Sequence, residues 1–276
     1  MPKNRFEASA APSETDSSTK RSSVTSSVSS VAEQALIFVA ASNAKTPAPL
    51  IEDFLVRLHD ASIGRLKETC ADVADSMMAD GIRSEDIADR YVPAVARKLG
   101  EEWSDDDLSF ASVSIGSARL QALLRRIGPD WSADSAPNPL VAESAALVIV
   151  TAEVHHTLGS MVLAGQLRRA GLSVRLVVGA ETSEVVDLIR DNNFAAVLIS
   201  ASITESMESL KTVVKAVRST VVPAPPIVIG GTVLDQVADV QTLTGADLAT
   251  TDVREALEFC DLISQASTKA AFMSAV

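Results

Sequence analysis

The sequence is poor in the residues that build disulfides, metal clusters and membrane spans. It has two cysteines, three histidines, two tryptophans and one tyrosine among 276 residues. Cys70 and Cys260 have neither a metal-ligand nor a disulfide spacing, so we expect both to be buried as small apolar side chains with no further role. No apolar run approaches the roughly 20 residues that cross a bilayer, and the N-terminus lacks the apolar core of a secretory signal. We therefore expect a cytoplasmic protein that does not enter a membrane.

Positive charge is scarce as well. The 24 Lys and Arg residues are outnumbered by 36 Asp and Glu residues, and the resulting formal net charge of -12 repels a phosphate backbone. The basic pairs Arg125-Arg126 and Arg168-Arg169 are small, and no helix-turn-helix pattern precedes them. We therefore expect no direct, unaided binding to DNA, and a protein or a small molecule as the partner. No catalytic constellation stands out, so we do not expect an enzyme.

Composition divides the chain into four parts. Residues 1–46 hold a Ser-rich run over 17–30 with too little apolar surface to offset the entropy of ordering it, so we predict a disordered tail. Residues 47–128 carry helical periodicity, and residues 129–142 form a linker around Pro137, Asn138 and Pro139. Residues 143–276 form a second domain.

The first domain is predicted to be a small four-helix bundle. Apolar residues recur at helical spacing over 50–58 and again over 63–77, where Asp80-Gly81 ends the pattern. A third helix opens at Ser84 and runs to Gly100 or Trp103. A fourth begins at Ser104, with the acidic residues 105–107 in its first turn, and continues to Arg126.

The second domain alternates strand and helix patterns, which predicts an α/β fold with a doubly wound parallel sheet of the flavodoxin or Rossmann kind. The predicted strands are 147–150, 174–178, 196–200, 227–229 and 248–249, and the predicted helices are 158–170, 183–192, 207–218, 234–242 and 254–266.

Three loops that follow predicted strands share an unusual chemistry. The first contains His155 and His156 and reaches Gly159, so an imidazole that can ligate a metal lies near a glycine that admits a bulky group. The third loop, over 200–204, offers hydroxyls, and the fourth holds Gly230-Gly231. Because parallel strands place their carboxyl ends at one edge, these features predict a ligand slot there.

These loops resemble the cobalamin-binding domain of methionine synthase, corrinoid proteins and cobalamin photoregulators. The family motif is Asp-x-His-x-x-Gly, then Ser-x-Leu, then Gly-Gly, and the chain shows Val-His-His-Thr-Leu-Gly over 154–159, Ser-Ala-Ser-Ile-Thr over 200–204 and Gly230-Gly231. The resemblance implies cobalamin as the cofactor and His156 as the lower cobalt ligand. It also implies that the nucleotide tail descends beside residues of the third and fourth loops: Ser200, Ser202, Thr204, Gly230 and Gly231.

Two positions depart from the family motif. Val154 replaces the aspartate that would hydrogen-bond the ligating imidazole, so that partner is either absent or supplied by Glu153 or another group. Ser202 replaces the leucine of Ser-x-Leu. His155 is a rival ligand, since Glu153 precedes it by two residues, but Leu158 would then take the glycine position. We therefore favour His156 over both His155 and the alternative of two loop histidines without a ligand.

The helical domain supports the same interpretation. Trp103 precedes a stretch of small residues that would let a flat macrocycle come close, and the resemblance implies a helical cap whose tryptophan covers the upper face of the corrin. The structural alternative is that Trp103 closes the bundle core above Phe110 and Val113. Both roles are open at this point.

A narrower resemblance extends from the helical cap to the C-terminus. The sequence over 103–116 and over 156–169 is similar to the PpaA/AerR-type antirepressors of anoxygenic phototrophs. It implies a cobalamin-binding, light- or redox-responsive transcription regulator whose partner is a repressor of photosynthesis genes. Two alternatives remain: a corrinoid methyl carrier for a methyltransferase system, and a signalling domain without a cofactor.

Overall fold

The computed structural model describes residues 49–131, 144–151 and 157–262. By its contacts the chain divides into residues 1–49, almost all outside this description, and a compact unit that begins at Leu50. The predicted tail, His155, His156 and most of the predicted linker therefore lie outside the described residues. Within the described part, no helix has both the length and the apolar character needed to span a bilayer.

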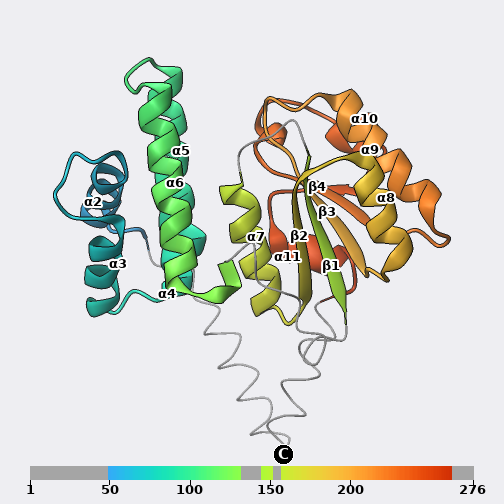
Figure 1. Cartoon of the computed structure of the whole chain (residues 1–276), viewed down its shortest axis with the longest axis horizontal. Helices are drawn as coiled ribbons and strands as arrows, with labels where there is room; N and C mark the ends of the chain where they lie inside the picture. Colours follow the sequence, from blue (N-terminus) through green and yellow to red (C-terminus); the bar gives the residue numbers. More distant parts are fainter. Residues whose placement is uncertain (1–48, 132–143, 152–156, 263–276) are drawn as a thin grey trace, which may run out of the picture. The chain divides into compact units, whose positions relative to one another are not determined.

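The first part of the compact unit is a helical bundle, as predicted (Figure 1). Its helices are α2 (Glu52–Ile63), α3 (Cys70–Ala79), a continuous rod made of α4 (Ser84–Asp86), the π-helical segment η1 (Ile87–Tyr91) and α5 (Val92–Ser104), and α6 (Phe110–Ile127). Large side chains such as Leu58, Met77, Leu99 and Leu120 form the core. A 3-10 turn, η2 (Pro129–Trp131), follows α6 and adds Trp131 to this core.

Two predicted helix starts in the bundle are wrong. The second helix begins at Cys70 and not at residue 63, because Gly64 ends α2 in a left-handed conformation and Thr69 with Asp72 forms the capping box of α3. The fourth helix begins at Phe110, with Ser109 as its N-cap, while residues 105–107 lie in the preceding turn. Asp106 has φ +62° there, which no helix interior allows.

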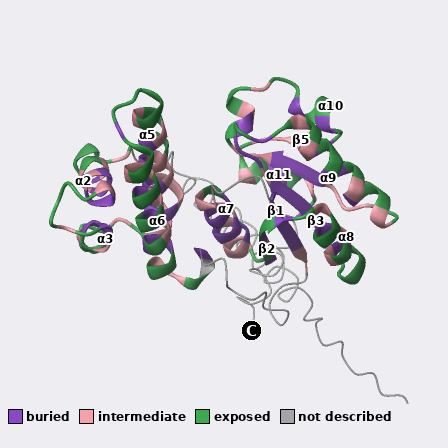
Figure 2. Cartoon of the chain, turned by 45° about the horizontal axis from the view of Figure 1, so that its top comes forward, coloured by how far each residue is buried: buried purple, intermediate pink, exposed green. Residues whose placement is uncertain are grey.

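The second part is the predicted parallel α/β sheet. Its strands are β1 (Ala145–Thr151), β2 (Ser173–Ala180), β3 (Ala196–Ser200), β4 (Ile227–Gly230) and β5 (Leu248–Ala249), in the spatial order β2-β1-β3-β4-β5 with every pair parallel. Successive apolar residues of β1 point to opposite faces of the sheet. Leu147 and Ile149 pack in one layer, and Ala146 and Val148 pack in the other. The central strands are accordingly buried on both faces, as Figure 2 shows.

Helices cover both faces of this sheet. One face packs against α8 (Thr182–Asp191), α9 (Met207–Thr220) and α10 (Val240–Thr244), and the other against α7 (Leu158–Arg169) and α11 (Val253–Phe259). The predicted helix over 234–242 is wrong, since Asp239, at φ +59°, separates the short 3-10 turn η3 (Thr232–Asp235) from α10. Strand order reverses between β1 and β3, and this crevice is where doubly wound sheets bind ligands.

Candidate functional site

Two of the predicted loops meet at the carboxyl edge of the sheet. Ser200 at the end of β3 is the register partner of Gly230 at the end of β4, and the backbone N–H of Ala201 donates to the carbonyl of Gly230 at 2.8 Å. The structure therefore brings Ser200, Ser202, Thr204, Gly230 and Gly231 together. β1 lies on the other side of β3, so its end at Thr151 borders the same edge.

The hydroxyls of the third loop form a small network. Ser202 is buried, and its Oγ lies 2.8 Å from Thr204 Oγ1, while Thr204 itself is exposed. The backbone N–H of Thr204 lies 3.4 Å from the same Ser202 oxygen, which fixes the turn. Thr204 is thus an exposed residue at the sheet edge whose hydroxyl contacts that of a buried serine.

The two glycines of the fourth loop have a structural role that the sequence did not reveal. A Cβ on Gly231 would lie 2.2 Å from the carbonyl oxygen of Ala201, and its φ is +106°. A Cβ on Gly230 would lie 2.7 Å from the carbonyl oxygen of Thr250. These glycines let the chain's own strand-end loops approach one another, whether or not a ligand tail passes beside them.

Gly159 is the predicted site residue nearest to the histidine loop that the structure describes. It is the second residue of α7 and is exposed, and no described residue lies within 4 Å of the place where a Cβ would be. The preceding Thr157 accepts a hydrogen bond from Gln121 of α6 at 3.0 Å. The start of α7 is therefore open at Gly159 and tied to the bundle at Thr157.

Sequence reasoning missed a buried carboxylate at this edge. Glu205 is 5% exposed, accepts a hydrogen bond from the hydroxyl of Thr151 at the end of β1, and lies 3.3 Å from the backbone N–H of Ser202. It connects the end of β1 to the β3 loop across the strand reversal. The available signal was a lone acidic residue directly after Thr204 in the predicted loop.

Trp103 lies near the end of α5 and does not close the bundle core. Its side chain is 45% exposed, and its ring lies 6.1 Å from that of Phe110, which is 68% exposed, at an interplanar angle of 57°. The alternative in which Trp103 packs over a buried Phe110 is therefore wrong. Two neighbouring aromatic side chains are instead left partly open to solvent on the bundle.

The third histidine is buried in the bundle and contacts the residue that precedes Trp103. His59 of α2 is 2% exposed, with Nδ1 3.1 Å from Asp60 Oδ1 and Nε2 2.9 Å from Glu102 Oε2. Glu102 precedes Trp103, and its carbonyl accepts the N–H groups of Asp107 and Leu108. His59 thus anchors the turn of α5 that holds Trp103.

The two cysteines have no polar role among the described residues. Cys70 is buried as predicted, but Cys260 is only half-buried. Burial raises the pKa of the Cys70 thiol, and burial together with Asp247 and Asp261 raises the pKa of Cys260 to about 11. Both thiols are therefore protonated and weakly nucleophilic near neutral pH.

Comparisons with known proteins agree with this architecture. Residues 144–260 match the family model of the B12 binding domain. An uncharacterized 20.5 kDa protein of Rhodobacter capsulatus, from the bchF-crtJ intergenic region, is 34% identical over 179 residues, which cover 65% of this chain and 92% of that protein. The fold is similar to that of the Methanosarcina barkeri monomethylamine corrinoid protein, at 15% identity and a TM-score of 0.59, over 75% of this chain and 97% of that one.

The matched residues begin one position before β1 and end one position after α11, so the family match covers the whole described sheet domain, including the edge where Ser200, Gly230 and Gly159 lie. The chain belongs to the B12 binding domain family, and its cofactor is cobalamin.

Proposed function

We propose that this protein is a cobalamin-dependent, light- or redox-responsive antirepressor that acts on a repressor of photosynthesis genes. The observation that carries the proposal is the relative from the bchF-crtJ intergenic region, a photosynthesis gene region, because the similarity extends over nearly all of that relative. The narrower sequence resemblance to antirepressors leads to the same role.

The residues at the sheet edge are suited to a corrinoid whose nucleotide tail enters the domain. Gly159 leaves open space at the start of α7, Thr204 presents a hydroxyl, and positions 230 and 231 add no side chains. In this proposal His156 is the lower ligand, and Ser200 and Ser202 line the tail beside Thr204. Bound cobalamin would supply a cobalt centre that responds to light or to redox state.

The aromatic pair on the bundle is proposed to cover the upper face of the corrin. Trp103 and Phe110 are exposed hydrophobic rings in contact with each other, and a flat macrocycle would bury both. His59 and Glu102 hold the turn that carries Trp103, so the aromatic pair is positioned before the cofactor binds.

Light should then alter the bundle when the upper ligand is photolabile. Protein loaded with an alkylcobalamin should change its scattering profile or its cleavage within 129–142 on illumination, and the Trp103→Ala variant should change less. Identical behaviour of the wild-type protein in darkness and light would contradict a light switch and leave a redox signal.

The output requires that the signalling state bind the partner more tightly than the other state, because a ligand without differential affinity shifts nothing. A labelled promoter is titrated with the repressor, with this protein, and with both, in the presence and absence of cobalamin. The proposal predicts that this protein releases the repressor only when loaded, and that it does not bind the promoter by itself. Unchanged repressor binding in every state would contradict the antirepressor role.

A corrinoid methyl carrier is the second candidate. It is compatible with the fold, because the structural similarity to the monomethylamine corrinoid protein covers 75% of this chain. A carrier would leave the repressor on the promoter and would serve methyltransferase partners instead, so the promoter titration separates the two functions.

A further inference from the structure

A groove of about 460 Å³ opens on the bundle between the end of α2, the segment over 64–69, the start of α3 and the outer side of α6. Its floor is apolar and includes Leu66, Cys70, Ala122 and Leu123. Leu66 and Ala122 are exposed, so this floor is open to solvent in the isolated chain.

Basic side chains form the rim of this groove, although the chain as a whole is strongly acidic. The rim holds Lys67, Arg119 and Arg126, and Glu68 is the one carboxylate in the lining. All three basic residues are exposed, and Lys67 makes no ion pair with any described residue. In a chain of net charge -12 this is a local reversal of sign.

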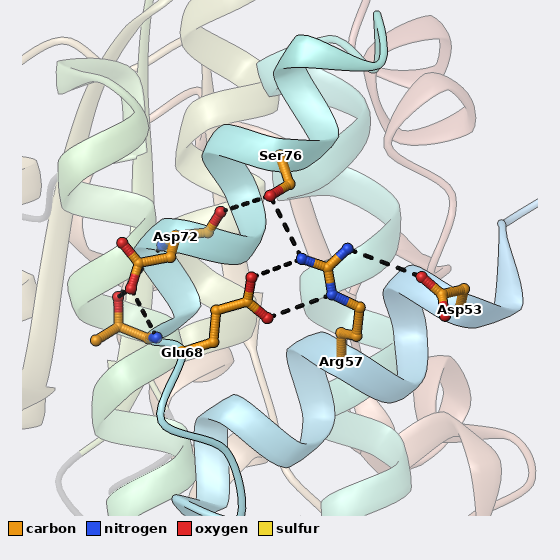
Figure 3. Close-up of polar contacts among 6 residues, drawn as sticks. Asp53, Arg57, Glu68, Asp72 and Ser76 are labelled. Atoms are coloured by element: carbon orange, nitrogen blue, oxygen red, sulfur yellow. Dashed lines mark hydrogen bonds and ion pairs between the residues drawn. The ribbon is translucent and has the colours of Figure 1, made fainter.

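The carboxylates near the groove are already engaged within the bundle, as Figure 3 shows for two of them. Glu68 receives two hydrogen bonds from Arg57, at 2.6 and 3.3 Å, and Asp72 caps the start of α3 by bonding the N–H and hydroxyl of Thr69. These contacts hold Glu68 on Arg57 and neutralise its charge. They also lower the pKa of Asp72 and keep it ionised at the cap.

Arg119 and Arg126 make different contacts within the bundle, but both can still bind a further carboxylate. Nη1 of Arg119 donates to the carbonyls of Ala61 and Ser62, at 3.3 and 2.9 Å, which fixes the guanidinium while using one of its three nitrogens. Arg126 pairs with Asp75 at 2.6 Å, and both side chains are about half exposed. Such a surface pair is weak and exchanges easily for another carboxylate.

The spacing of these cations favours a partner segment that is long enough to contact both of them. Arg119 and Arg126 are seven residues apart on α6, which is about 10.5 Å along the helix axis, and Ala122 and Leu123 lie between them on the same side. A small anion would contact one cation and leave the apolar floor exposed. A helix with an apolar stripe flanked by acids two turns apart would cover the floor and meet both cations.

We propose that this groove is a docking site for an acidic amphipathic helix of a partner protein. Gln121, which faces away from the groove on α6, makes the contact to Thr157, so the groove stays open while α6 contacts α7. The inference rests on the bundle alone and does not depend on cobalamin.

The test uses the full chain without cobalamin and a fluorescein-labelled 18-residue helical peptide with a Leu stripe flanked by Glu. A second peptide has Lys in place of every Glu. By fluorescence anisotropy the Glu peptide should bind and the Lys peptide should not, and added salt should weaken the binding. The Arg119→Glu/Arg126→Glu variant should lose about tenfold or more in affinity, a change of about 1.4 kcal/mol.

A matched control separates a local effect from a change in total charge. Arg190→Glu/Arg254→Glu makes the same charge change on exposed helix positions of the sheet domain and should bind the Glu peptide as the wild type does. Because Arg119 also contacts the end of α2, Ala122→Trp serves as a second variant, which fills the floor without changing charge and should also weaken binding.

Four outcomes would overturn the inference: no binding of the Glu peptide to the wild type, equal binding of both peptides, equal losses in the groove and control variants, or a self-associating chain whose dimer uses the groove. None of them bears on cobalamin binding, which is measured separately.

Discussion

At the scale of single residues, Gly231 is the clearest constraint on the sheet edge. Its backbone conformation, φ +106° and ψ -176°, is open in practice to glycine alone, and a Cβ there would overlap the carbonyl oxygen of Ala201. We expect Gly231→Ala to lower the free energy of unfolding by about 2–4 kcal/mol, from strain plus a forced backbone shift. Urea unfolding measures it.

Gly171 provides the matched control for this prediction. It also has a positive φ, +90°, but nothing lies within 4 Å of a Cβ placed there. Gly171→Ala should therefore cost about 1 kcal/mol, the conformational strain alone. Equal losses in the two variants would show that the close approach to Ala201 has no energetic weight. Because Gly231→Ala is expected to destabilise the fold, a loss of cobalamin affinity in a Gly231 variant is interpreted only after its folding has been measured.

The fluorescence of the two tryptophans should differ in its accessibility to a quencher in solution. Trp103 is half exposed, whereas Trp131 is 3% exposed, packs on Gly165 and lies under the guanidinium of Arg169 at 4.5 Å. We predict that acrylamide quenches the emission of Trp131→Phe strongly and that of Trp103→Phe weakly. The reverse order would contradict the exposed aromatic pair on which the proposed cap depends.

At the scale of elements, one ion pair joins the π-helical segment η1 to α7. Asp89 pairs with Arg169, and the guanidinium of Arg169 stacks on the ring of the buried Trp131. We expect Arg169→Met to cost about 2–4 kcal/mol, because it leaves Asp89 unpaired in a partly buried place. The Asp89→Leu/Arg169→Met double variant should cost less than this single one.

The same pair has a pH signature. Burial raises the pKa of Asp89 above its usual value, an effect that Arg169 offsets only in part. A carboxyl group with a higher pKa in the folded state binds its proton more tightly there, so its contribution to stability falls as pH rises above the unfolded pKa of about 3.9. The stability of the wild type relative to Asp89→Asn should therefore decrease from pH 4 to pH 7. A relative increase over that range would show that Arg169 outweighs burial and lowers the pKa of Asp89.

The element order could be predicted from the sequence, and the errors have one physical cause. Buried parallel strands are continuous apolar runs, so the predicted ends of all five strands agree with the structure to within two residues. The wrong helix boundaries lie at residues with positive φ: Gly64, Asp106, Asp239 and Asp261, the last because α11 ends at Phe259 and not at 266. Apolar periodicity continues through such residues, so the pattern does not reveal that the chain turns there.

At the scale of the whole molecule, the net charge opposes direct binding to DNA. The net charge of -12 opposes a phosphate lattice, so the protein alone should not shift a labelled promoter at physiological salt. An electrophoretic shift assay checks this. Tight, sequence-specific binding by the protein alone would contradict an output through another protein.

The candidate site could be predicted in part. Ser200, Ser202, Thr204, Gly230 and Gly231 come together because parallel strands end at one edge, which strand order alone implies. The burial of Glu205 and the contact of Gly231 with Ala201 could not be predicted, because both depend on how two loops pack against each other. The predicted ligand His156 and its rival His155 lie outside the described residues, so their assignment still rests on spacing.

The most direct test of the account is the absorption spectrum of the protein mixed with cobalamin, for the wild type, His156→Ala and His155→Ala. We predict that the wild type shows the spectrum of cobalamin with its own base displaced by an imidazole. His155→Ala should keep this spectrum, and His156→Ala should lose it. A wild type that binds no cobalamin, or a signature that depends on His155 and not on His156, would contradict it.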